Sequence, residues 1–111
     1  MSTYSKRLYS EEYRVSVQDE EGIKFSLRIF FGSEDDLALY EIEECIIGNF
    51  DYSSDRVFIF KHKSSKAAKR MADDLCTKIT EIAKISYGDY EVQRRGNFVL
   101  FGTERAIEDA L

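Results

Sequence analysis

The first hydrophobic pattern in the chain is a strict alternation of apolar and polar residues. Tyr13, Val15 and Val17 alternate with polar side chains, and a second alternating run at 23–31 follows the acidic turn at 19–22. Alternation on both sides of a glycine-containing turn is typical of a β-hairpin. We therefore predict two antiparallel strands here. The apolar face of the second strand would carry Ile23, Phe25, Leu27, Ile29 and Phe31.

A helix start follows the predicted hairpin. Ser33 supplies a hydroxyl suited to an N-cap, and the acidic residues at 34–36 would occupy the first turn, where the helix dipole favours negative charge. We expect a short helix at 37–44. The segment 45–50 either ends this helix or forms a strand, and we prefer the strand because 56–61 then becomes its hairpin partner.

The most hydrophobic strand is predicted in the middle of the chain. The polar residues 51–55 indicate a turn, and the four residues after Arg56 are all apolar, without alternation. A strand that is apolar on both faces is expected at the centre of a sheet covered on both sides. We therefore predict 56–61 as the central strand.

The longest helix is predicted directly after this strand. Ser64 or Ser65 provides the N-cap, and apolar residues then recur every three or four positions, as one stripe of a helix requires. The stripe consists of Ala68, Met71, Ala72, Leu75, Ile79 and Ile82.

A hairpin and a helix are predicted to end the chain. Strands at 90–94 and 98–101 flank a glycine-containing turn at 95–97. Thr103 is the expected N-cap of the last helix, at 104–111.

Length and composition agree with a single domain, residues 1–111. A chain of this length builds one modest core, and its 43% hydrophobic and 14% aromatic content excludes a disordered chain. The predicted fold class is α+β, with a mainly antiparallel sheet and the element order ββ-α-ββ-α-ββ-α. The middle of this order is the split βαβ arrangement of ferredoxin-like folds.

The sequence has no apolar run long enough to cross a membrane and no signal-peptide pattern. We expect a cytoplasmic protein for the sequence as written, and an extracytoplasmic one if a signal sequence has been trimmed away. Cys45 and Cys76 are isolated thiols, which are expected in packed segments as small hydrophobic residues. Only export would favour a disulfide between them.

Charge is unevenly distributed along an acidic chain of net charge -5. Residues 1–54 carry 5 basic and 12 acidic side chains, whereas residues 55–70 carry 6 basic and 1 acidic. The basic segment begins the predicted long helix, where backbone N–H groups and hydroxyls favour anions. The alternative is that its lysines are solvated surface. The candidate anion-binding residues are Lys61, Lys63, Ser64, Ser65, Lys66, Lys69 and Arg70.

A second candidate surface is the face of the central strand that points away from the predicted helices. Arg56, Phe58 and Phe60 would share this face, and Arg28 and Phe30 would lie beside them on the neighbouring strand. Exposed aromatic rings with flanking arginines bind single-stranded RNA by base stacking and phosphate contacts. The alternative is that these rings are ordinary core.

Two short motifs on this face resemble those of an RNA recognition motif (RRM) domain. Arg56-x-Phe58-x-Phe60 is similar to the basic-x-aromatic-x-aromatic part of its third-strand motif, and IFF at 29–31 looks like its first-strand motif. The glycine and the closing hydrophobic residues of the third-strand motif are replaced, and the domain is acidic. The resemblance implies single-stranded RNA binding.

Residues 37–111 resemble a small α+β domain of unassigned function that is common in exported lipoproteins of Gram-positive bacteria. The likeness is carried by DRVFIFK at 55–61, a strand before a long charged helix, and by GNFVL at 96–100, a strand before the last helix. The chain departs from this pattern in its additional N-terminal hairpin and in lacking a lipid-anchoring cysteine. The resemblance implies a fold and no activity.

No enzyme motif, cofactor motif or metal-ligand spacing can be named in the sequence. The acidic clusters at 34–36 and 41–44 are interpreted as helix capping and a solvated face. We expect a non-catalytic, acidic interaction module without a cofactor, which binds a protein partner as an adaptor or inhibitor. The alternative function is single-stranded RNA binding through the sheet face. An exposed edge strand at Tyr13–Val17 would permit homodimerisation.

Overall fold

The computed structural model describes residues 13–32, 36–50, 55–82 and 90–111. A five-stranded sheet in the order β1-β2-β3-β5-β4 forms the centre of the protein, and every neighbouring pair of strands is antiparallel. The described elements are β1 (Tyr13–Val17), α1 (Glu20–Phe31), α2 (Asp36–Leu39), β2 (Ile42–Phe50), β3 (Arg56–His62), α3 (Ser65–Ile82), β4 (Tyr90–Arg95), β5 (Phe98–Thr103) and α4 (Glu104–Ala110).

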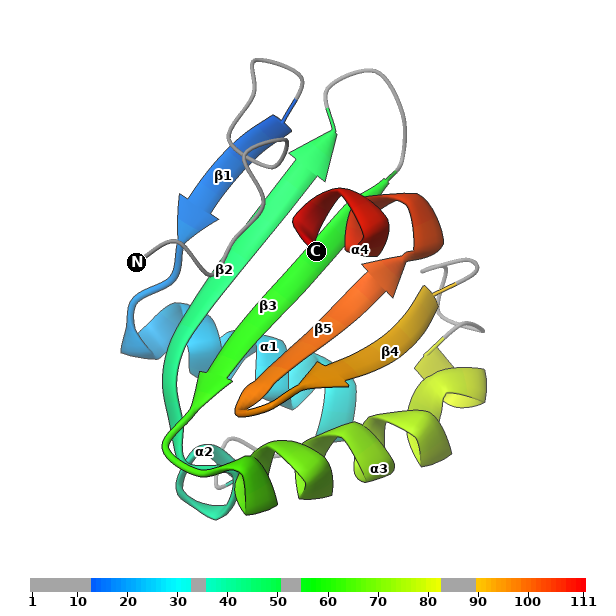
Figure 1. Ribbon diagram of the computed structural model, residues 1–111. Helices are drawn as coiled ribbons and strands as arrows, with labels where there is room; N and C mark the ends of the chain where they lie inside the picture. Colours follow the sequence, from blue (N-terminus) through cyan, green and yellow to red (C-terminus); the bar gives the residue numbers. More distant parts are fainter. Residues whose placement is uncertain (1–12, 33–35, 51–54, 83–89) are drawn as a thin grey trace.

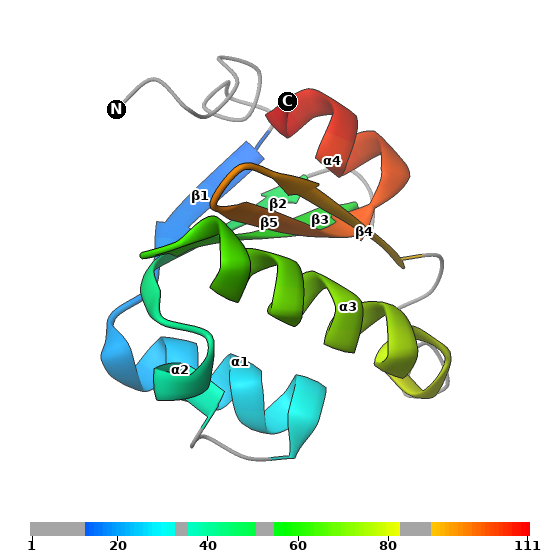
Figure 2. The same cartoon turned by 60° about the horizontal axis from the view of Figure 1, so that its bottom comes forward.

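Helices cover both faces of the sheet (Figure 1). α1 and α3 lie on one face and α4 lies on the other, as the turned view in Figure 2 shows. Phe58 and Phe60 of β3 belong to the larger core, under α1 and α3, whereas Val57 and Ile59 belong to the smaller core, under α4. The prediction of a central strand that is covered on both faces is confirmed.

The predicted strand at 23–31 is a helix, α1. Asp19 is its N-cap and accepts a hydrogen bond from the N–H of Gly22 at 2.8 Å, while Gly32 ends the helix in the left-handed conformation with φ 77°. The N-terminal hairpin prediction is wrong because several residues of the alternating run also fit a period of 3.6, and the acidic segment before it caps a helix instead of forming a turn. The buried residues of α1 lie on one helical face and are Ile23, Ser26, Leu27 and Phe30.

The α+β class and the antiparallel sheet are confirmed, but the element order is β-α-α-β-β-α-β-β-α instead of ββ-α-ββ-α-ββ-α. β3, α3 and β4 form a split βαβ unit, because β5 lies between two strands that run in the same direction. β1 instead pairs directly with β2 and is antiparallel to it. The described N-terminal half therefore does not form a second such unit, and the strand order is not that of a ferredoxin-like fold.

The second predicted helix is shorter than expected. Its described part, α2, ends at Leu39, and β2 already begins at Ile42, where the prediction placed a helix at 37–44. The preferred interpretation of 45–50 as a strand is confirmed, and β2 pairs with β3 as the expected hairpin partner. The predicted cap at Ser33 and the turn residues 51–54 lie outside the described residues.

The start of α3 agrees with the prediction. The Oγ of Ser64 accepts a hydrogen bond from the N–H of Ala67 at 3.1 Å, which satisfies one of the free donors of the first helical turn. The side chains of Ile79 and Ile82 lie outside the described part of the chain. The other members of the predicted stripe are buried: Ala68, Met71, Ala72 and Leu75.

The C-terminal hairpin and helix are confirmed as well. Gly96 lies in the turn between β4 and β5 with φ 60°, a conformation that favours glycine. Thr103 precedes α4 as predicted, but its side chain forms no capping hydrogen bond. Its Oγ1 instead accepts a hydrogen bond from the N–H of Arg56 at 3.4 Å, which links the start of β3 to the end of β5.

Replacing Asp19 tests whether this residue caps α1, the helix that stands where a strand was predicted. Asp19→Ala removes the acceptor for the Gly22 N–H and should lower the free energy of unfolding by about 1 kcal/mol. Asp19→Asn keeps an acceptor and should stay within about 0.5 kcal/mol of the wild type. Urea denaturation followed by circular dichroism measures both. Equal stability of the alanine variant and the wild type would contradict the capping role.

Candidate functional site

The three aromatic rings of the predicted RNA surface lie in the larger core. Phe30, Phe58 and Phe60 are buried, and their most exposed member, Phe58, has a relative exposure of 5%. The rings of Phe30 and Phe58 meet edge to face with centroids 5.0 Å apart, and Phe30 meets Phe101 at the same distance. Phe30 reaches them from α1 and not from a neighbouring strand. These rings are therefore closed off from stacking on a base.

The two arginines of the same predicted surface lie on different elements, α1 and β3. Arg28 is exposed on α1, with its guanidinium 6.0 Å from the ring centroid of Phe25. Arg56 begins β3, and its guanidinium lies 5.9 Å from the ring centroid of Phe58. The placement of Arg28 on a strand beside β3 is wrong, because the segment 23–31 is helical. The five residues do not form one open face.

The basic corner, residues 61–70, is formed by the end of β3 and the start of α3. Carboxylates lie among its cations. The Nζ of Lys61 is 4.0 Å from Glu43 and 3.8 Å from Glu44, and Lys69 donates a hydrogen bond to Asp73 at 2.8 Å. Acidic neighbours weaken the attraction of these lysines for an anion.

Ser64 in the basic corner is already engaged in hydrogen bonds. Besides accepting from Ala67, its hydroxyl donates to the carboxylate of Glu41 at 3.4 Å. A bound anion would lie close to this glutamate and would be repelled by it. The anion site remains a prediction. The remaining candidate anion-binding residues of this corner are exposed: Lys63, Ser65, Lys66, Lys69 and Arg70.

His62, the single histidine of the chain, ends β3 and is fully buried. Its Nδ1 lies 2.6 Å from the carbonyl oxygen of Tyr40, which can only accept, so Nδ1 carries the proton. Nε2 has no hydrogen-bond partner among the described residues. Burial lowers the pKa of His62, although the hydrogen bond to Tyr40 and the charge of Glu41 act in the opposite direction. The ring is neutral near pH 7 and would gain a buried, unpaired N–H on protonation.

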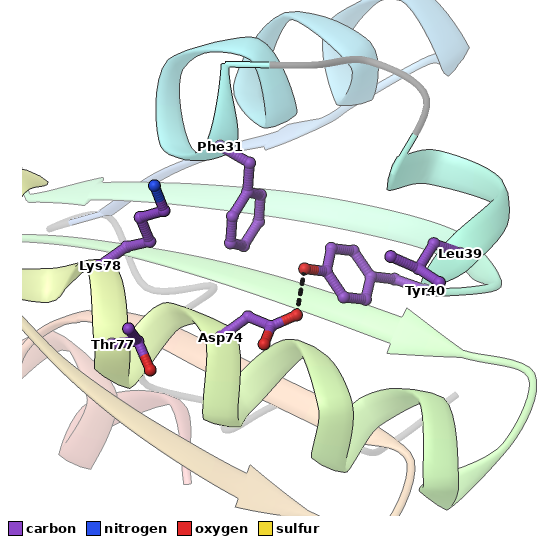
Figure 3. Close-up of a pocket in the computed structure, with 6 residues that line it drawn as sticks. All are labelled: Phe31, Leu39, Tyr40, Asp74, Thr77 and Lys78. Carbon is purple, nitrogen blue, oxygen red and sulfur yellow. Dashed lines mark hydrogen bonds between the residues drawn. The ribbon is translucent and has the colours of Figure 1, made fainter.

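A surface pocket of about 280 Å³ opens between α2 and α3, beside the end of α1 (Figure 3). The hydroxyl of Tyr40 donates a hydrogen bond to Oδ2 of Asp74 at 2.6 Å across this pocket. No local pattern in the sequence pointed to this pocket, because its lining residues come from separate elements and share no local spacing. The pocket is lined by Phe31, Leu39, Tyr40, Asp74, Thr77 and Lys78.

The two cysteines lie in different environments, and both are free thiols. Cys45 is buried on β2, as expected of a small hydrophobic residue, and burial raises the pKa of its thiol to about 12. A thiol with this pKa is not a nucleophile at neutral pH. Cys76 is exposed on α3, where the expectation of a packed position is wrong.

Comparison with protein-family models, curated proteins and solved structures finds no match to this chain. The resemblances to an RRM domain and to the lipoprotein domain therefore stay predictions. None of the described helices has the length and apolar character needed to cross a membrane. In the same part of the chain, no three His, Cys, Asp or Glu residues are grouped as metal ligands.

Truncation of Phe60 distinguishes a core ring from an exposed one. Phe60→Ala should lower the free energy of unfolding by about 3–5 kcal/mol or prevent folding, because it removes a buried ring and leaves a cavity. The matched control is Phe25→Ala, which truncates a ring that is 58% exposed on α1 and should cost about 0.5 kcal/mol or less. Chemical denaturation measures both, and equal costs would show that Phe60 is not core.

Acid should destabilise the protein through His62. Because the folded-state pKa lies below the unfolded value of 6.5, the unfolded state binds more protons as the pH falls. The contribution of His62 to the free energy of unfolding is fully present above pH 6.5. Below this pH the free energy of unfolding falls by at most about 1.4 kcal/mol per pH unit, until the folded-state pKa is reached. Denaturation of the wild type and of His62→Gln between pH 7.5 and 5.5 measures this loss. The same slope in both proteins would exclude His62 as its cause.

Proposed function

We propose that the domain is a non-catalytic interaction module that binds a protein partner by adding the partner's strand to β1. β1 is an edge of the sheet, and no other strand of the described residues pairs with its outer side. An open edge presents backbone donors and acceptors to a further strand, which is a common mode of peptide recognition. This unpaired edge is the observation that carries the proposal.

The backbone groups available for pairing follow from the ladder with β2. The N–H of Gln18 donates to the carbonyl of Cys45 at 2.9 Å, so this pair is hydrogen-bonded across the two strands. Inward and outward groups alternate along an antiparallel strand. The N–H and C=O groups of Tyr13, Val15 and Val17 therefore point away from β2, where a partner strand would meet them.

β1 is a more open edge than β4, at the other side of the sheet. β4 carries three charged residues in YEVQRR, all of them exposed, and charged side chains protect an edge from further pairing. β1 carries one, Arg14, in YRVSV. The contrast favours β1 as the edge that accepts a strand.

The side chains of β1 supply an apolar contact as well. Val17 is 70% exposed and lies opposite Ile46 of β2. Ile59 of β3 and Leu100 of β5 continue this row of apolar side chains across the sheet. A partner strand that places an apolar side chain beside Val17 would extend this row, which adds hydrophobic contact to the backbone hydrogen bonds.

The non-catalytic part of the proposal is supported by the environments of two reactive groups. The thiol of Cys45 is buried with a raised pKa, and the ring of His62 is buried with a lowered pKa. Neither side chain is open to a substrate. The RNA alternative has less support, because its stacking rings are buried and Arg28 lies on a helix and not on the sheet.

Val17→Pro tests the edge without disturbing the sheet. Proline removes an N–H that points outward, so the ladder with β2 should persist. Binding to a partner should weaken at least about tenfold, because a ladder hydrogen bond is lost and the ring obstructs the incoming strand. The matched control is Val17→Thr, which keeps the N–H and the branched shape and should bind within about threefold of the wild type.

The assay uses the three proteins as baits for affinity capture from the source cells, followed by titration of each captured protein. Amide exchange should become slower at Val15 and Val17 in the complex. Analytical ultracentrifugation shows whether the partner is a second copy, since the mass would then double for the wild type and the threonine control only. Capture that is unaffected by the proline would exclude β1 as the docking edge.

A further inference from the structure

The pocket in Figure 3 has the size of a site for one side chain. Its volume of about 280 Å³ lies just below the range of roughly 300–1,000 Å³ that is usual for small-molecule sites. The side chain of a single amino acid fits such a space.

One oxygen in this pocket has no hydrogen-bond donor in the part of the chain that the structure describes. The carboxylate of Asp74 is half-buried, and its Oδ2 accepts the hydrogen bond from Tyr40. Its Oδ1 has no partner among the described residues. The neighbouring Thr77 uses its hydroxyl hydrogen on the backbone carbonyl of Asp73 at 3.2 Å, and Lys78, which also lines the pocket, is engaged in an interaction of its own. The carboxylate therefore has the capacity to accept from an incoming donor.

The rest of the pocket wall is apolar and aromatic. Leu39 is 41% exposed, and the rings of Phe31 and Tyr40 lie with centroids 5.2 Å apart and planes at 45°. Figure 3 shows both rings and Leu39 on the α1 and α2 side, with Asp74 facing them from α3. Such walls favour an aliphatic chain, and aromatic rings also attract cations.

We propose that this pocket binds the side chain of an arginine or lysine from a peptide segment of a protein partner. The aliphatic stem lies against Phe31 and Leu39, and the cationic head donates to Oδ1 of Asp74. This inference rests on the proposed function in that the ligand belongs to a protein, but it uses a surface other than β1.

The charge of the occupant follows from the carboxylate. An apolar side chain would cover Asp74 and remove water from Oδ1 without replacing its hydrogen bonds, which is unfavourable. An acidic side chain would be repelled by the same group, and Lys78, the cation that also lines the pocket, already has an interaction of its own. A basic side chain both pairs with the carboxylate and is attracted by the net charge of -5 of the whole chain.

The test is an NMR titration of the ¹⁵N-labelled full chain with three blocked amino acids. N-acetyl-arginine methylamide and N-acetyl-lysine methylamide carry the proposed cation, and N-acetyl-citrulline methylamide is a neutral analogue of the arginine probe. The cationic probes should shift the amide signals of Phe31, Leu39 and Asp74 saturably in the millimolar range. The citrulline probe should bind at least about tenfold more weakly. Equal binding of the arginine and citrulline probes, or no shift with either cation, would overturn the proposal.

Two variants locate the effect within the pocket. Asp74→Asn removes the charge but retains an acceptor for the hydroxyl of Tyr40. This variant should lower the affinity for the arginine probe at least about tenfold. The control, Asp73→Asn, makes the same charge change at the adjacent exposed residue, which pairs with Lys69 outside the pocket lining. Its affinity for the arginine probe should stay within about twofold of the wild-type value. Equal losses in both variants would indicate general charge attraction and would overturn the site.

The probe comparison uses the wild-type protein, so its result does not depend on the folding of a variant. The blocked amino acids also do not require β1. Failure of the pocket test therefore does not affect the edge-strand proposal. Failure of the Val17→Pro test likewise does not affect the pocket proposal, which the titration alone decides.

Discussion

The burial of β3 on both faces is the constraint on which the rest of the structure depends. Two consecutive pairs of apolar residues, Val57 with Phe58 and Ile59 with Phe60, send side chains to opposite sides of the sheet, and each side has to be shielded from water. α1 and α3 shield the phenylalanines, whereas the short α4 shields the smaller aliphatic residues. Gly102 allows β5 to run close beside β3, because a Cβ there would lie 2.1 Å from the backbone oxygen of Arg56.

This packing determines which parts of the surface remain for recognition. The rings that would make a stacking surface are buried in the larger core, where Phe30, Phe58 and Phe101 contact one another. Two groups of other kinds remain open among the described residues: the backbone edge of β1, and the carboxylate of Asp74 beside a partly exposed apolar wall. Recognition of a protein segment uses both kinds of group, since strands pair through the backbone and side chains fill pockets.

The distribution of charge in space differs from its distribution along the chain. The segment 55–70 is strongly basic in sequence, but folding brings β2 beside β3 and thus places Glu43 and Glu44 next to Lys61. Within α3, Lys69 pairs with Asp73 one turn later. A basic run therefore becomes a mixed surface, because neighbours across a sheet are set by register and not by sequence distance.

The sequence by itself determined the elements whose local signals agree with one another. β3, α3, β4, β5 and α4 each have an apolar pattern with a polar turn, a turn glycine, or a serine or threonine at the helix start on at least one side, and these were predicted in place. The segment 23–31 was mispredicted because its apolar residues satisfy the periods of both a strand and a helix, and the cap at Asp19 with the left-handed Gly32 selects the helix. Only the tertiary structure decided the strand order, the burial of the aromatic rings and the pocket at Asp74. These features bring together residues from separate elements, and contacts of that kind depend on register and packing across the whole fold, which no local pattern encodes.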